Sequence, residues 1–165
     1  MLEDWGLVVA PEKIQRQPPG KYLGMTLTET VIRPQKLTIR ADNVKTLNDV
    51  QKLVGDLQWI RNVGGITNTD LQPLYELLQD GKDPYEPRQL TQPAEAALQI
   101  IAQKISHGSI YRILEGSPIQ LYIYDSREEI FGILAQRREQ QSDPLCILEW
   151  IFGPSHFKRT VTTRI

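Results

Sequence analysis

The chain has 165 residues, with 19 lysines and arginines against 20 aspartates and glutamates, so its formal net charge at pH 7 is −1. This length suits one or two small domains, and the charge balance excludes the overall basic character of many nucleic-acid-binding proteins. The single cysteine, Cys146, excludes an internal disulfide and is typical of a reducing, intracellular compartment. No apolar run approaches the roughly 18 residues that a membrane-spanning helix needs, and residues 1–11 do not resemble a signal peptide.

Residues 1–40 predict a β-hairpin. Apolar residues occur from the first positions, which indicates the middle of a fold rather than its beginning. The sequence QRQPPG (15–20) predicts a turn, because proline fixes φ and removes a backbone donor. Residues 21–28 and 30–33 then predict two short strands, and Pro34 ends the second. From the residues alone, Gly24 indicates a bulge in an ordinary hairpin.

Residues 45–60 predict the helix around which the chain is organised. Thr46 is a good N-cap, and Asp49 three residues later completes a capping box. The apolar residues that follow have helical spacing and share one face; they are Leu47, Val50, Leu53, Val54, Leu57 and Ile60. We expect the helix to end within residues 62–65, where glycine can adopt the left-handed conformation.

A second stripe on this helix consists of Gln51, Gly55 and Trp59, which lie one turn apart and outside the apolar face. Glycine inside a helix costs about 1 kcal/mol relative to alanine, so Gly55 needs a reason. One interpretation is a surface that lies close against a flat ligand. The other is that Gly55 admits a neighbouring segment of the chain while Trp59 packs.

Two further helices complete a predicted bundle. The first spans 69–79, with Thr69 as N-cap and Gly81 past its end, and the second begins after Thr91 and closes at Gly108. Three amphipathic helices of this size need one another to bury their apolar faces. After Gly108 the pattern becomes extended, and residues 119–124, 129–136 and 145–152 predict three strands in a meander. In the first of these, odd-numbered apolar residues alternate with even-numbered polar and aromatic ones.

Two stretches resemble retroviral reverse transcriptases, most closely those of betaretroviruses and related endogenous elements. TLNDVQKLVGDLQWI (46–60) resembles the first thumb helix, and PPGKYLGMTL (18–27) resembles the primer grip at the palm–thumb junction. The resemblance implies that Gln51, Gly55 and Trp59 line the minor groove of the template–primer duplex. It also implies that the primer's 3′ end is held by Tyr22, Leu23, Gly24 and Met25.

The resemblance implies an α+β chain in three parts. Residues 1–40 would be the end of the palm with the primer-grip hairpin, 41–108 the three-helix thumb, and 109–165 the start of a connection domain, a partial ribonuclease-H-like β-meander. We therefore expect a fragment of a retroviral Pol polyprotein, from an endogenous element, whose function is to bind RNA/DNA hybrid or duplex. The expected partners are nucleic acid and either the rest of the polyprotein or a second polymerase chain, without a membrane, in the cytoplasm or the virion. The alternative is a non-catalytic remnant that acts as a protein-interaction or oligomerisation module.

Polymerase chemistry needs two metal ions held by carboxylates, which reverse transcriptases place in a Tyr-x-Asp-Asp motif. The sequence has no Asp-Asp pair, so we expect that motif upstream of residue 1. We predict no catalytic residue, metal or cofactor in this chain, with Mg²⁺ in the intact polymerase, and an inactive isolated fragment. Asp125 fits a strand-end turn better than a metal site, and His107 and His156 fit loops better than metal ligands.

Overall fold

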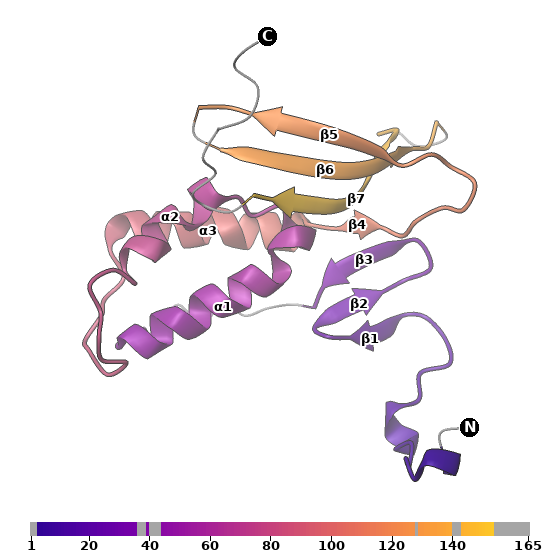
Figure 1. Ribbon diagram of the computed structural model, residues 1–165, viewed down its shortest axis with the longest axis horizontal. Helices are drawn as coiled ribbons and strands as arrows, with labels where there is room; N and C mark the ends of the chain where they lie inside the picture. The colour runs from indigo at the N-terminus through magenta and orange to yellow at the C-terminus, as the bar shows by residue number, and fades with distance from the viewer. Residues whose placement is uncertain (1–2, 36–38, 40–43, 128, 140–142, 154–165) are drawn as a thin grey trace.

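The computed structural model of the protein describes residues 3–35, 39, 44–127, 129–139 and 143–153. Helices lie on one side of the molecule and two small antiparallel sheets on the other (Figure 1), which confirms the predicted α+β class. After two 3₁₀ turns, η1 and η2, the elements are β1 (Gly20–Tyr22), β2 (Met25–Leu27), β3 (Val31–Pro34), α1 (Leu47–Gly64), α2 (Asn68–Glu76), α3 (Gln92–His107), β4 (Ile110–Tyr111), β5 (Gln120–Asp125), β6 (Ile130–Arg137) and β7 (Leu145–Phe152). No described helix is long and apolar enough to cross a membrane.

The first sheet has the order β1-β2-β3-β4. The prediction of one strand over residues 21–28 was wrong, because the chain reverses at Leu23 and Gly24 and forms β1 and β2. Both turn residues have positive φ, 47° at Leu23 and 74° at Gly24, as in the two-residue turns that match the twist of a hairpin. Gly24 therefore closes a tight turn instead of making a bulge. The following strand, β3, ends at Pro34 as expected.

The helices form one core, as predicted. Thr46 and Asp49 make the expected capping box at the start of α1, and Gly65 caps its end with φ 65°. The apolar face of α1 packs with Ile66, α2 and α3, so most of its stabilisation comes from shared burial rather than from helix propensity. The buried cluster consists of Val50, Leu53, Val54, Leu57, Ile60, Ile66, Leu71, Leu74, Ala94, Leu98, Ile101 and Ile105.

The predicted N-cap of α2 was wrong. Thr67, and not Thr69, caps the helix: its side chain accepts from the Asp70 amide, and the Asp70 carboxylate accepts from the Thr67 amide at 2.8 Å. The same carboxylate binds Lys104 of α3 at 2.5 Å, a contact that local sequence does not reveal. α3 begins after Thr91 as predicted. His107 is its last residue and not part of a loop, with Nδ1 2.9 Å from the Gln103 carbonyl oxygen.

The second sheet is the predicted meander, β5-β6-β7. One of its faces meets the helices: the guanidinium of Arg61 lies 4.0 Å from the centre of the Phe152 ring, and Trp150 lies against Gly65. Strand β4 was not predicted. It pairs with β3, so residues from the expected palm part (1–40) and the expected connection part (109–165) share one sheet. The proposed domain boundaries stay a prediction.

Candidate nucleic-acid interface

The two groups of predicted site residues meet in space. The indole N–H of Trp59 donates to the backbone carbonyl of Leu23 at 3.1 Å, although the two residues are 36 positions apart. The first sheet lies beside α1 (Figure 1), with β3 in contact with the helix. The β1–β2 turn and the polar stripe of α1 therefore form parts of one surface, which we call the hairpin–helix surface: Tyr22, Leu23, Gly24, Gln51, Gly55 and Trp59.

The hairpin side of this surface is open to solvent. Tyr22 is 66% exposed and Leu23 57% exposed, and Gly24 is also exposed. Met25 differs from the other predicted site residues: it is half-buried and packs against the helical core. Its side chain is therefore positioned as an anchor for the hairpin rather than as an exposed contact.

The helix side of the surface is also open. Gln51 and Gly55 are exposed, and Trp59 is 60% exposed. A Cβ atom placed on Gly55 would meet nothing within 4 Å. Among the described residues, no segment packs against Gly55, so the interpretation that it admits a neighbouring part of the chain has no support there.

Sequence reasoning missed residues that hold the hairpin. The backbone N–H of Gln35 donates to the Gly24 carbonyl at 2.8 Å, and its side-chain Nε2 donates to the Met25 carbonyl at 3.3 Å. The Gln15 side chain bridges the backbone of Lys21, accepting from its N–H and donating to its carbonyl. No local pattern marks either glutamine, because each role depends on a contact with another segment.

The electrostatics of the surface are mixed. Lys21 beside the turn and Lys52 on α1 are exposed cations, while Asp56 on the same helix is an exposed anion. At the start of the helix, the hydrogen bond from the Thr46 hydroxyl and those from the Lys45 and Thr46 amides hold the pKa of Asp49 below its usual value. The surface therefore offers shape, amide and ring contacts more than positive charge.

Arg61, which sequence reasoning also missed, fixes the end of α1. It is buried; its Nε donates to the Ile66 carbonyl at 3.2 Å, and its Nη2 donates to Asn68 at 2.9 Å. Burial lowers its pKa, and the nearby Tyr75 and acidic groups counteract that shift. Because the guanidinium remains charged at any ordinary pH, these contacts and the Phe152 ring stabilise a buried cation that joins α1 to β7.

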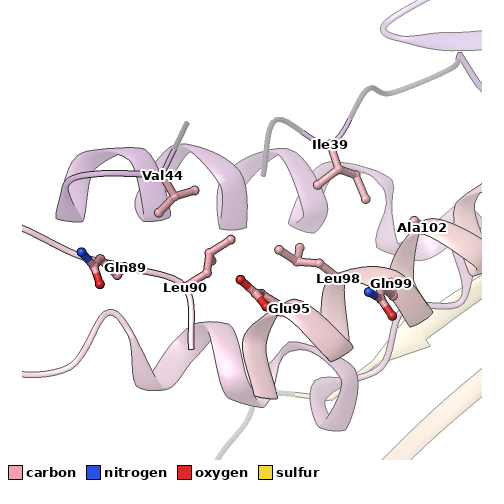
Figure 2. Close-up of a pocket in the computed structure, with 8 residues that line it drawn as sticks. All are labelled: Ile39, Val44, Gln89, Leu90, Glu95, Leu98, Gln99 and Ala102. Carbon is pink, nitrogen blue, oxygen red and sulfur yellow. The ribbon is translucent and has the colours of Figure 1, made fainter. Parts of the chain in front are cut away.

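The remaining polar candidates do not gather into a site. Within the described ranges, no group of three or more His, Cys, Asp or Glu side chains could hold a metal ion. Asp125 ends β5, paired with Ile130, and His156 lies outside the described residues. A hollow of about 660 Å³ lies between Ile39 and Val44 on one side and α3 with the residues just before it on the other (Figure 2). It contains none of the predicted site residues. Its lining is Ile39, Val44, Gln89, Leu90, Glu95, Leu98, Gln99 and Ala102.

Comparison with known proteins identifies the class of protein to which this chain belongs. Residues 34–99, which include α1 and α2, match the family described as reverse transcriptase thumb domain. The chain belongs to the retroviral reverse transcriptases, as a portion that includes the thumb.

Its relatives are retroviral polyproteins. The chain is 39% identical over 160 residues to the Gag-Pro-Pol polyprotein of Simian retrovirus SRV-2, an alignment that covers 97% of this chain and 9% of that protein. It is 35% identical over 161 residues to the Gag-Pro-Pol polyprotein of mouse mammary tumor virus (strain BR6), an alignment that covers 98% of this chain and 9% of that protein. The Pol-related polyprotein of the mouse intracisternal A-particle MIA14 is 32% identical over 154 residues, an alignment that covers 90% of this chain and 18% of that protein. The chain thus spans less than a fifth of the length of these relatives.

Proposed function

We propose that this chain binds the template–primer duplex within a retroviral reverse transcriptase and contributes no catalytic group of its own. The observation that carries the proposal is the Trp59–Leu23 hydrogen bond. It joins the hairpin and the helix, two elements that the family resemblance relates to the primer end and the minor groove. Both Gag-Pro-Pol relatives span nearly the whole chain, which supports a polymerase context.

The chemistry of the hairpin–helix surface fits a duplex of any sequence. Gln51 offers a flexible amide that can donate to or accept from sugar and base-edge groups. Gly55 leaves the helix backbone uncovered, so a sugar–phosphate strand can approach closely. Tyr22 adds an exposed ring on which a base or sugar can pack. Such contacts carry little sequence information, which suits an enzyme that copies every sequence.

The few charges near the surface indicate which part of duplex binding this chain supplies. With Lys21 and Lys52 near the surface and Asp56 beside them, this chain neutralises few phosphates. We propose that the rest of the Pol polyprotein, or a second polymerase chain, supplies the other phosphate contacts, the paired carboxylates and Mg²⁺. The role of this chain is then to position the duplex.

Binding of an RNA/DNA hybrid to the 165-residue chain tests the proposal. Gly55→Leu should weaken binding at least about tenfold, because a bulky side chain opposes close approach by overpacking. Ala96→Leu, on the exposed side of α3, is the matched control and should leave affinity unchanged. Affinity should also fall as salt rises, because phosphate contacts release counterions. Equal affinity of Gly55→Leu and the unaltered chain, with both proteins folded, would refute the proposed contact.

The alternative of an interaction module has one observation in its favour. Within the described residues, β5 is an edge of its sheet, and it exposes apolar side chains, with Leu121 56% and Ile123 69% exposed. An edge strand of this kind favours pairing with another chain. Sedimentation across a concentration series separates the two functions. Self-association without salt-sensitive hybrid binding would favour the alternative.

A further inference from the structure

We infer that Trp59 is a positioning residue, whose indole N–H holds the Leu23–Gly24 turn against α1 so that hairpin and helix present one preformed surface. The consequence for duplex binding rests on the proposed function. The positioning itself is a property of the free protein, and it can be tested without nucleic acid.

The turn has a hydrogen-bond partner from outside the hairpin. Tyr22 and Met25 pair across the β1–β2 ladder, which leaves the two residues between them without a ladder partner. Leu23 has φ 47°, a left-handed conformation that side-chain-bearing residues adopt at a cost. Such a conformation persists where surrounding contacts determine it. The Leu23 carbonyl receives its hydrogen bond from Trp59.

Separate contacts hold the other parts of the turn. The Gly24 carbonyl accepts from the Gln35 amide at 2.8 Å, and the Met25 side chain packs against the helical core. These contacts fix the hairpin to β3 and to the bundle interior. The Trp59–Leu23 hydrogen bond adds the link to the exposed flank of α1, where Gln51 and Gly55 lie.

The geometry also restricts how Trp59 can meet a ligand. Its N–H is already donated to Leu23, so the indole can offer ring surface but not its donor. Trp59→Phe removes the donor and keeps an aromatic ring, and because the side chain is 60% exposed the helical core should stay folded. This variant therefore separates the positioning role from a simple ring contact.

The first test measures deuterium exchange of the indole N–H groups by NMR in the free 165-residue chain. A hydrogen bond of ordinary net strength should slow exchange at Trp59 about 3- to 10-fold relative to an open indole, and Trp5, 81% exposed, is the internal reference. In Trp59→Phe, the backbone amides of Tyr22 and Met25, which pair across the β1–β2 ladder, should lose protection while those of α3 keep theirs. Equal exchange at Trp59 and Trp5, or unchanged protection in the variant, would overturn the inference whatever the nucleic-acid affinity.

The second test is a double-mutant cycle on hybrid affinity. Tyr22→Ala should weaken binding in the unaltered chain, and its effect should shrink about threefold or more in the Trp59→Phe background, since coupled sites are not additive. Gln51→Ala, on the helix itself, is the control, and its effect should be the same in both backgrounds. Additive effects of Trp59→Phe and Tyr22→Ala would overturn the inference. If the free-protein exchange result holds and the chain does not bind hybrid at all, the proposed function fails while the positioning role stands.

Discussion

Gly55 and Gly65 show how differently one residue type can act on the same helix. A Cβ at Gly55 would meet open space, whereas a Cβ at Gly65 would lie 2.9 Å from the Trp150 ring, at a backbone with φ 65°. Gly65 is required by the packing of α1 against β7. Gly55 has no such requirement among the described residues, which is consistent with the proposed contact with nucleic acid.

Replacing each glycine by alanine should therefore have opposite effects on stability. Gly55→Ala should raise the free energy of unfolding by up to about 1 kcal/mol, because alanine is the better helix former. Gly65→Ala should lower it by about 1–2 kcal/mol or more, from the left-handed backbone and the contact with Trp150. Urea unfolding of both variants measures the difference. If both substitutions changed the free energy of unfolding in the same direction, the open surroundings of Gly55 or the close packing of Gly65 would be wrong.

At the scale of single elements, short side-chain networks determine where the helices begin and how a loop attaches. The Thr46–Asp49 and Thr67–Asp70 boxes satisfy amides at the starts of α1 and α2 that the helices themselves leave unpaired. On β6, the buried Gln136 plays a similar part: it bonds the Leu114 amide and carbonyl at 2.9 Å each and the Ser117 carbonyl at 2.8 Å.

The α1 capping box should give stability that depends on pH. Hydrogen bonds lower the folded-state pKa of Asp49 below its ordinary value of 3.8, so its contribution is present above pH 3.8 and is lost as pH falls through the lowered pKa. The difference in Tm between the unaltered chain and Asp49→Ala should therefore be constant near neutral pH and shrink in acid below that value. Asp56→Ala, in the middle of the same helix, serves as the control. A difference that grows in acid would contradict the assignment.

Loss of the Gln136 network should destabilise the second sheet. Gln136→Leu removes the partner of partly buried backbone groups of Leu114 and Ser117, at a cost of up to about 1–3 kcal/mol for each group that stays unsatisfied. We expect a reduced free energy of unfolding in urea, while Gln103→Leu on the exposed side of α3 changes it little. An unaffected Gln136→Leu protein would show that water replaces the network.

At the scale of the whole molecule, contacts between distant segments connect the helices to both sheets. β4 extends the hairpin sheet, and Arg61 and Trp150 join α1 to the meander. The hairpin–helix surface is therefore held from both sides. The proposed role of this surface is to position a duplex, and the described residues around it include no cluster of metal-binding side chains.

The 165-residue chain should accordingly fail to extend a primer. With Mg²⁺ or Mn²⁺ and a primed homopolymer template, we expect no nucleotide incorporation, because two-metal catalysis needs paired carboxylates and the sequence has no Asp-Asp pair. The assay is incorporation of labelled nucleotide, with an intact retroviral polymerase as positive control. Incorporation by a preparation free of other polymerases would contradict the proposed division of roles.

The sequence by itself determined the features that depend on near neighbours. Apolar residues at helical spacing, with Thr46 and Thr91 as caps, predicted α1 and α3 correctly. Three extended segments, the first with alternating residues, predicted the β5-β6-β7 meander. The family resemblance, carried by two contiguous stretches, identified the class of protein, and it named site residues whose roles stay predictions.

Only the tertiary structure decided the features that depend on distant partners. Residues 21–28 carry one continuous strand pattern, yet they divide at Leu23, where the Trp59 indole and the Gln35 amide hold the turn. The two residues of β4 are too few for a recognisable pattern, and pairing with β3 defines them. Helix caps and periodicity act within a few residues, so they can be read along the chain. Hydrogen bonds between segments far apart in sequence exist only once the helices have packed and brought those segments together.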